Sequence, residues 1–251
     1  MNPTLRNAET VLTTNYARWS RHYDALYAFK DYAAEVDGLF AVIADENPGA
    51  RSLLDVACGT GRHLSLLKNR FDAAGLDLNP DLLAVAAQRM PGLPLHCASM
   101  ETFALGQRFD VITCLFSSIA FMRTEHSLRA AIANFAAHLE PGGVLLVEPW
   151  FAPENYRYGT INARFVDEPD VKIAWMYTSA LEDGLSVLDN HFLVGTPAGI
   201  ESMRDTHVVG LYSDGQYQAA FRAAGLSVRR VQDDLWKRGL YIARSAPDSA
   251  P

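Results

Sequence analysis

Short apolar runs alternate with longer stretches of helical periodicity through the first half of the chain. The apolar runs have the length and bounding turn residues of buried strands, and the stretches between them repeat apolar residues every three or four positions. This alternation is typical of strand–helix units stacked around a parallel sheet. We expect strands at Ser52–Ala57, Ala73–Leu78, Pro94–Ala98, Phe109–Leu115 and Val144–Glu148. Helices are expected at Asp31–Ile43, Gly61–Asn69, Pro80–Met90 and His126–Leu139.

The pattern becomes strand-like between about Tyr158 and Tyr212, with turn signals that contain glycine. We interpret this stretch as three or four antiparallel strands inserted into the main sheet or appended beside it. A helix at Gln216–Ala224 and strands at Ser227–Gln232 and Leu240–Arg244 follow. The pattern therefore predicts an α/β fold, in which a Rossmann-like seven-stranded sheet carries an added antiparallel β segment.

Composition and charge restrict the classes of partner. The chain has 251 residues, of which 49% are hydrophobic and 20% charged, and this is typical of a globular protein with a sizeable core. The formal net charge of -7 argues against a nucleic-acid partner, because such proteins present a basic face to phosphates. No apolar stretch has the length of a membrane helix, and Met1–Thr14 lacks the apolar centre of a signal peptide. We therefore expect no membrane partner.

The three cysteines indicate a reducing compartment. Cys58, Cys97 and Cys114 have neither the spacing of metal ligands nor the even number of a disulfide framework. Each ends or follows an apolar run, where small buried thiols are common. We expect no metal site and a cytoplasmic location.

A turn with two glycines follows the first predicted strand. Gly59 and Gly61 open the backbone to a ligand, because no side chain blocks its approach. Asp77, 18 residues after Gly59, falls at the end of the second predicted strand, where a carboxylate can accept both hydroxyls of a ribose. Leu64 replaces the third glycine of the dinucleotide fingerprint, so the turn suits a nucleoside without a pyrophosphate, such as S-adenosylmethionine. The alternatives are an ordinary tight turn and an acidic residue that begins a helix.

Asp55 is a carboxylate inside the otherwise apolar first strand. A buried carboxylate requires hydrogen bonds or a paired charge. We expect Asp55 to hold the glycine turn or to bind the ammonium group of a methionine moiety.

Further motifs are spread along the chain from about Tyr23 to Ala243. They are Tyr23–Tyr27, Lys30–Tyr32, Leu54–Gly61, Phe116–Ser118, Leu139–Gly143, Val147–Trp150, His191–Phe192, Asp205–His207 and Arg238–Leu240. Together they resemble the S-adenosylmethionine-dependent nucleotide-sugar N-methyltransferases, above all the dTDP-3-amino-3,6-dideoxyhexose N,N-dimethyltransferases of macrolide antibiotic biosynthesis. The glycine turn is common to many methyltransferases, whereas the Glu-Pro-Trp and Arg-Gly-Leu segments are far more selective.

The resemblance implies a domain organisation and an assembly. An N-terminal helical lid at 1–48 folds over the cofactor, and its aromatic residues begin at Tyr16 and Trp19. Residues 49–150 and 213–245 form the seven-stranded methyltransferase domain. Residues 151–212 form the antiparallel insertion that shapes the substrate pocket, and similar enzymes are homodimers.

The resemblance also assigns binding residues. With the glycine turn and its two acids, the positions expected to bind S-adenosylmethionine are Tyr27, Tyr32, Asp55, Ala57, Gly59, Gly61, Asp77, Leu78, Ser99, Met100 and Leu115. The positions that match substrate contacts are Trp150, Ser179 and Arg238. The guanidinium of Arg238 suits a pyrophosphate oxygen. Ser99 departs from the family pattern, in which an aspartate meets the adenine amine.

Three side chains are candidates for a direct role in the reaction. Tyr27 can orient the amine or the cofactor, although its ordinary pKa near 10 makes it a poor base. His191 and His207 match histidines of the family, and the alternative is that both are hydrogen-bonded residues of the pocket wall. Phe121 departs from the family, whose members often have histidine or tyrosine near the reacting amine. Glu148 is a further candidate for a base or for a structural carboxylate.

The sequence supports one main function and two alternatives. The main hypothesis is N-methylation of the amino group of a dTDP-linked deoxyamino sugar. A second methyltransferase hypothesis has a different small acceptor, methylated on nitrogen or oxygen. The third is a nucleoside-binding module without catalysis, which the substitution at Phe121 leaves open. The missing third glycine disfavours an NAD-dependent oxidoreductase.

Overall fold

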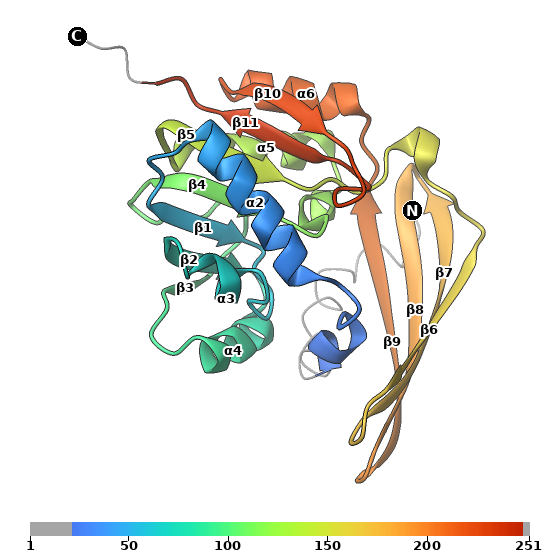
Figure 1. The fold of residues 1–251 in the computed structure, drawn as a ribbon. Coiled ribbons are helices and arrows are strands. Elements are labelled where there is room, and N and C mark those ends of the chain that lie inside the picture. The colour runs from blue at the N-terminus through green and yellow to red at the C-terminus, as the bar shows by residue number, and fades with distance from the viewer. Residues whose placement is uncertain (1–21, 248–251) are drawn as a thin grey trace.

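A seven-stranded sheet forms the centre of the protein (Figure 1). The computed structural model describes residues 22–247. The strand order is β10-β11-β5-β4-β1-β2-β3, and β11 runs antiparallel to both of its neighbours while the other pairs are parallel. The strands are β1 (Ser52–Val56), β2 (Asp72–Asp77), β3 (Leu95–Cys97), β4 (Phe109–Cys114), β5 (Leu139–Val147), β10 (Ser227–Val231) and β11 (Leu240–Arg244).

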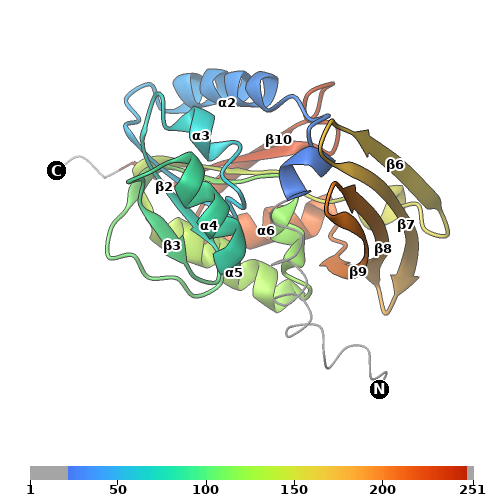
Figure 2. The ribbon, with the colours of Figure 1, turned by 90° about the horizontal axis from the view of Figure 1, so that it is seen from below.

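Helices cover both faces of this sheet (Figure 2). Successive residues of a strand point to opposite faces, so Leu53 joins the core beneath α2, α3 and α4 while Leu54 joins the core beneath α5 and α6. The helices are α2 (Tyr32–Glu46), α3 (Leu64–Leu67), α4 (Pro80–Arg89), α5 (Glu125–Ala137) and α6 (Asp214–Ala223). A short helix at residues 22–26 and the 3₁₀ turns η2 (Ser118–Phe121) and η3 (Pro153–Asn155) complete the set.

Helix starts are fixed by local side chains. Asp31 accepts a hydrogen bond from the backbone of Ala34 and caps α2, and Asn79 caps α4 ahead of Pro80. Such caps satisfy backbone N–H groups that have no partner inside the helix. They fix the residues at which α2 and α4 begin.

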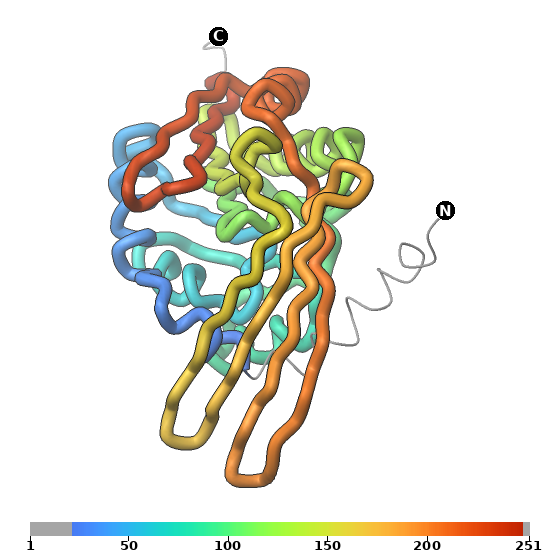
Figure 3. Tube along the Cα trace, turned by 90° about the vertical axis from the view of Figure 1, so that its right-hand side faces the viewer, coloured from blue at the N-terminus to red at the C-terminus, as the bar shows by residue number. Residues whose placement is uncertain are grey.

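A second sheet of four antiparallel strands lies between β5 and α6 in the sequence. Its strands are β6 (Ile161–Asp167), β7 (Lys172–Glu182), β8 (Leu185–Thr196) and β9 (Gly199–Gly210). Figure 3 shows the hairpins β6–β7 and β8–β9 extending beyond the central sheet. One face, which we call the inner face, packs Ile173 and Phe192 against Leu26 of the N-terminal segment. The opposite face is the outer face.

The α/β class, the seven-stranded sheet and the added antiparallel segment are confirmed. Most boundaries differ from the prediction by one to three residues, and two differences have a clear structural cause. The helix expected from Gly61 is α3 alone, because Gly61 has a left-handed φ of 76° that cannot continue an α-helix. β5 begins at Leu139 rather than Val144, because Phe109 pairs with Leu139 before a register shift in the ladder. Within the described part of the chain, no helix is long and apolar enough to cross a membrane.

Candidate active site

The glycine turn after β1 has a left-handed backbone at three positions. The φ angles are 58° at Ala57, 56° at Gly59 and 76° at Gly61. A Cβ atom on Gly59 would meet nothing within 4 Å, whereas one on Gly61 would come closer than 3.0 Å to the side chain of Met90. Gly61 is therefore favoured by its left-handed backbone and by tight packing, and Gly59 leaves open space beside its peptide.

Asp77 ends β2 directly beside this turn. Its carboxylate accepts hydrogen bonds from the backbone N–H groups of Gly59 and Asn79, both at 2.8 Å. Burial raises the pKa of Asp77 although these N–H groups oppose the rise. The predicted spacing thus brings the acid against the glycine turn, where a bound ribose would meet both.

Asp55 is buried in β1 and has a partner on the neighbouring strand. Thr113 of β4 donates a hydrogen bond to Asp55 Oδ1 at 2.7 Å. Burial raises the pKa of Asp55 to about 6, opposed by the nearby His63. A carboxyl with a raised pKa gains from a cationic ligand, because the cation stabilises its ionised form.

A cavity lies over the turn and joins residues from three parts of the chain. The N-terminal segment, the glycine turn and the end of β4 all contribute to its wall. It is lined by Tyr23, Tyr32, Asp55, Ala57, Cys58, Gly59, Thr60, Arg62, His63, Leu115, Phe116 and Ser118. The sequence-predicted Tyr32, Asp55, Ala57, Gly59 and Leu115 therefore share one site.

The N-terminal segment is fastened to the glycine turn by charged residues. Thr60 donates a hydrogen bond of 2.7 Å to Asp24, and Arg89 of α4 pairs with the same carboxylate. Tyr27 packs edge-on against Phe116 with ring centroids 5.0 Å apart. These contacts hold residues of the predicted lid over the site, and the expected lid residues Tyr16 and Trp19 lie outside the described residues.

A buried polar cluster of Lys30, Glu35 and His63 lies against Tyr32. Glu35 pairs with Lys30 and with His63 Nε2, the latter at 2.7 Å. Burial raises the pKa of Glu35, but the hydrogen bonds from His63 and Lys30 outweigh it and lower the pKa overall. The guanidinium of Arg62 lies 4.7 Å from the centroid of the Tyr32 ring, so a cation borders the cavity.

Three of the positions predicted to bind the cofactor, Leu78, Ser99 and Met100, follow β2 and β3. Leu78 is 63% exposed next to Asp77 and presents an apolar surface at the edge of the site. The Ser99 hydroxyl accepts from the backbone of Glu101 at 3.3 Å. Met100 is buried, and its carbonyl accepts from Asn134. The three predicted positions thus lie at the ends of adjacent strands, next to Asp77.

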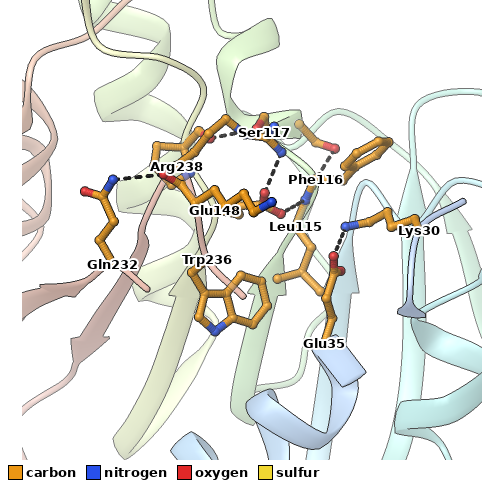
Figure 4. A network of polar contacts seen from close by, with 12 residues as sticks. Lys30, Glu35, Leu115, Phe116, Ser117, Glu148, Gln232, Trp236 and Arg238 are labelled. Carbon is orange, nitrogen blue, oxygen red and sulfur yellow. Dashed lines mark hydrogen bonds and ion pairs between the residues drawn. The ribbon is translucent and has the colours of Figure 1, made fainter. Parts of the chain in front are cut away.

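The turn after β4 has two residues in left-handed conformation. Phe116 and Ser117 have φ angles of 52° and 61°, and each such non-glycine residue costs roughly 1–2 kcal/mol. Glu148 accepts a hydrogen bond of 2.7 Å from the backbone of Phe116, and Ser117 donates one of 2.7 Å to the carbonyl of Pro149. Bonds to the end of β5 therefore hold this turn in place (Figure 4).

The three predicted substrate residues lie in two different places in the structure. Arg238 donates to Glu148 at 2.6 Å, and its guanidinium lies 5.5 Å from the centroid of the Trp150 ring. Ser179 is buried in β7, where its hydroxyl lies 2.7 Å from that of Thr160. The structure thus brings Arg238 and Trp150 together, and it engages Ser179 in fixing the segment that enters β6.

The two predicted histidines lie on opposite faces of the antiparallel sheet. His207 is on the inner face, where its Nε2 lies 2.8 Å from the buried Asp205 and its ring is 5.9 Å from that of Phe121. The side chain of His191 is 57% exposed on the outer face and 3.4 Å from Asp189. Only His207 is therefore brought beside η2 and the site.

Comparisons with known proteins agree with this geometry. Residues 53–143 match the model of a methyltransferase domain. The chain is 40% identical, over 88% of its length and 94% of the relative, to a dTDP-3-amino-3,4,6-trideoxy-alpha-D-glucopyranose N,N-dimethyltransferase from Streptomyces venezuelae. This chain belongs to the dTDP-amino-sugar N,N-dimethyltransferase family. A second relative, a dTDP-3-amino-3,6-dideoxy-alpha-D-glucopyranose N,N-dimethyltransferase from Streptomyces fradiae, is 41% identical over 84% of both chains.

Solved structures of sugar methyltransferases have the same fold. The crystal structure of Streptomyces venezuelae DesVI matches with a TM-score of 0.84 and 39% identity, over 90% of this chain and 98% of that one. The S-adenosylmethionine-bound CalS10, an amino pentose methyltransferase from Micromonospora echinaspora, matches with a TM-score of 0.82 and 38% identity over 89% and 96% of the two chains. This N,N-dimethyltransferase family member is thus an enzyme whose cofactor is S-adenosylmethionine.

The residues present in this methyltransferase fit that cofactor. The cavity combines the open backbone at Gly59, the acids Asp55 and Asp77 beside it, and a cation at Arg62. No cluster of His, Cys, Asp and Glu within residues 22–247 has the arrangement of a metal site. Sequence reasoning missed Arg62, and the signal for it was a cation directly after the glycine turn.

Proposed function

We propose that this enzyme transfers methyl groups to the amino group of a dTDP-linked deoxyamino sugar. The observation that carries the proposal is Arg238, which lies at the same end of the sheet as the glycine turn. One of its nitrogens donates to Glu148, and its buried Nε has no hydrogen-bond partner among the residues that the structure describes. A buried guanidinium N–H without a partner suits an anionic ligand, such as the pyrophosphate of a nucleotide sugar.

The cofactor roles follow from the positions in the cavity. S-adenosylmethionine, when bound, supplies the electrophilic methyl group. We assign the methionyl carboxylate to the hydroxyls of Tyr27 and Tyr32 with Arg62, since Tyr32 and Arg62 line the cavity and Tyr27 packs against Phe116 of its wall. Asp55 faces the methionyl ammonium, and Asp77 accepts the ribose hydroxyls. The loop backbone at Ala57, Gly59 and Gly61 borders the methionyl part, Leu78, Ser99 and Met100 border the adenine, and Leu115 flanks the sulfonium.

The chain contributes alignment and desolvation to the reaction. Direct displacement requires the amine, the methyl carbon and the sulfur in line, and such alignment gains on the order of 7–11 kcal/mol. The apolar wall formed by Phe116 and Phe121 disfavours the charged form of an acceptor ammonium. It therefore promotes the neutral amine, which is the nucleophile.

We assign the proton from the acceptor to His207 rather than to His191, because His207 lies on the inner face and is held by Asp205. Burial, with the nearby Tyr32 and Tyr177 adding to it, raises the pKa of Tyr27 well above its ordinary value. The Tyr27 hydroxyl therefore keeps its proton at neutral pH. It orients the reactants by donating a hydrogen bond and does not act as the base.

We also propose a homodimer that pairs through the outer face. Five large apolar side chains on or beside this face are between 48% and 78% exposed, and they are Ile161, Phe165, Met176, Leu193 and Ile200. Burying apolar area of this kind favours association. His191 would then lie within the interface. Light scattering should give about 55 kDa, twice the 27.6 kDa chain, and Phe165→Asp should give the monomer.

We place the enzyme in the cytoplasm, since Cys58, Cys97 and Cys114 are free thiols. CalS10 is involved in calicheamicin biosynthesis. By this likeness we propose that the enzyme supplies methylated amino sugars for antibiotic biosynthesis.

Turnover with matched acceptors tests the function. Formation of S-adenosylhomocysteine is measured with a dTDP-3-amino-dideoxyhexose, with the same amino sugar lacking the nucleotide, and with simple amines and hydroxyl compounds. We expect turnover with the nucleotide sugar and much slower turnover with the free sugar. Faster turnover of a free amine or hydroxyl compound would support a different acceptor. Cofactor binding without turnover of any acceptor would support a binding module.

A further inference from the structure

Glu148 has both carboxylate oxygens engaged in the site. One oxygen accepts a hydrogen bond of 2.7 Å from the backbone N–H of Phe116, and the other accepts one of 2.6 Å from Arg238 Nη2 (Figure 4). The residue is only 5% exposed. Both oxygens of this carboxylate already accept a hydrogen bond, so neither is placed to take a proton from an acceptor.

The first partner of Glu148 is a turn that needs support. Phe116 and Ser117 both have left-handed φ angles, which non-glycine residues keep only where surrounding contacts enforce them. Phe116 and the preceding Leu115 line the cofactor cavity. The hydrogen bond to Glu148 therefore fixes the part of the cavity wall that Leu115 and Phe116 form.

The second partner is a guanidinium whose buried Nε donor is unused among the described residues. Arg238 uses Nη2 for Glu148, and its buried Nε has no hydrogen-bond partner within the described chain. Its own backbone is held as well, because Arg230 donates to the Arg238 carbonyl at 2.7 Å. The fork of Arg238 is thus oriented before any acceptor binds.

We propose that Glu148 is a positioning residue that joins acceptor binding to the wall of the cofactor site. It orients Arg238 so that Nε receives an anionic oxygen of the acceptor's diphosphate, and the same carboxylate holds Phe116 against the cofactor. This inference rests on the proposed function, since it requires a nucleotide acceptor. Glu148 affects nucleotide binding by orienting Arg238, and it affects turnover by holding Phe116 in place.

The first experiment is a double-mutant cycle of Glu148→Gln and Arg238→Gln, read by calorimetry with dTDP. Glu148→Gln keeps an oxygen for Phe116 and loses the charge that orients Arg238. We expect it to weaken dTDP binding about tenfold in the natural chain and by less than about twofold beside Arg238→Gln. Binding of S-adenosylhomocysteine should change by less than about twofold, which also shows that each variant is folded. Equal losses of dTDP affinity in both backgrounds would overturn the proposal.

The second experiment compares Glu148→Gln with Glu148→Ala at saturating acceptor. The alanine variant also removes the acceptor for Phe116, so its kcat should fall roughly tenfold below that of the glutamine variant. Equal kcat values would contradict the link to Phe116. This comparison needs no change at Arg238.

Glu125 and Arg129 provide a matched control. They form an ion pair of the same 2.6 Å length on the exposed surface of α5. Glu125→Gln should leave dTDP affinity unchanged, so a general effect of lost charge is separated from the role of Glu148. If the natural enzyme binds no dTDP, the proposed function fails and the inference fails with it. If it binds dTDP and the cycle is additive, only the inference is overturned.

Discussion

The backbone N–H of Gly59 donates a hydrogen bond of 2.8 Å to the carboxylate of Asp77. The acid therefore fixes the glycine turn and remains beside the open space over Gly59. In the proposed site Asp77 also binds the ribose, so replacing Asp77 should lower cofactor affinity more than replacing an acid with equivalent backbone bonds elsewhere.

Asp77→Asn should weaken S-adenosylmethionine binding by about 10–100-fold. An amide nitrogen cannot accept a hydrogen bond from a ribose hydroxyl, and one of the hydrogen bonds from a backbone N–H is lost. Calorimetry measures the loss. Asp110→Asn is the control: Asp110 also accepts from two backbone N–H groups, of Arg51 and Ser52, but at the other end of β1. It should lower stability and leave cofactor affinity unchanged. Equal losses of affinity in both variants would refute the role of Asp77.

Gly61→Ala should destabilise the fold more than Gly92→Ala. Both glycines have left-handed φ, 76° and 83°, so both variants pay roughly 1–2 kcal/mol in backbone strain. Only the Cβ at Gly61 meets other side chains: the flexible end of Met90, which can move at little cost, and the Cβ of Ala86 at 3.3 Å, so packing adds about 1 kcal/mol. Urea unfolding with a cofactor-free sample compares the two free energies. Equal destabilisation would show that the turn has room for a side chain.

Asp55 should make the cofactor-free enzyme less stable as pH rises from about 4 to about 6. Burial raises the folded-state pKa from 3.8 to about 6, so in this window the folded state holds more protons than the unfolded state. The unfolding free energy of the natural chain should therefore fall by about 2 kcal/mol across this window relative to that of Asp55→Asn, out of about 3 kcal/mol for the whole titration. Parallel urea titrations at several pH values measure the difference. A difference that does not change with pH would contradict an ionising, buried Asp55.

His207→Gln should lower kcat by about 10²-fold or more, the usual contribution of a positioned base. Asp205→Asn should lower it less, since it removes only the group that orients His207. His191→Gln should change kcat by less than about threefold, because that side chain lies on the outer face, opposite to His207. Steady-state kinetics at saturating acceptor compare the three variants. A large loss at His191 with none at His207 would reverse the assignment.

The fold was predictable because its signals are local. Each strand, the glycine turn and the distance from Gly59 to Asp77 are written in short stretches of sequence. The antiparallel segment was equally clear from its alternation. Contacts between distant segments were not predictable. Thr113 donates a hydrogen bond to Asp55, which lies 58 residues earlier in the sequence. Glu148 accepts hydrogen bonds from Phe116 and Arg238, which belong to two other parts of the chain.

The two histidines show the same limit. His191 and His207 belong to neighbouring strands, and sequence alone treated them as equivalent. Pairing of Leu188 with His207 and of His191 with Arg204 puts the two side chains on opposite faces. Register depends on the whole hairpin, so the sequence identified both candidates and the structure separated them.

We propose methyl transfer to the nitrogen of a nucleotide-linked amino sugar. Its most direct test is mass spectrometry and NMR of the product formed from methyl-labelled S-adenosylmethionine and a dTDP-3-amino-dideoxyhexose. We predict that the label appears on the sugar nitrogen, as a monomethyl and then a dimethyl product, while the diphosphate stays intact. An unlabelled nucleotide sugar recovered from enzyme that binds S-adenosylmethionine, or label found on oxygen, would contradict the account.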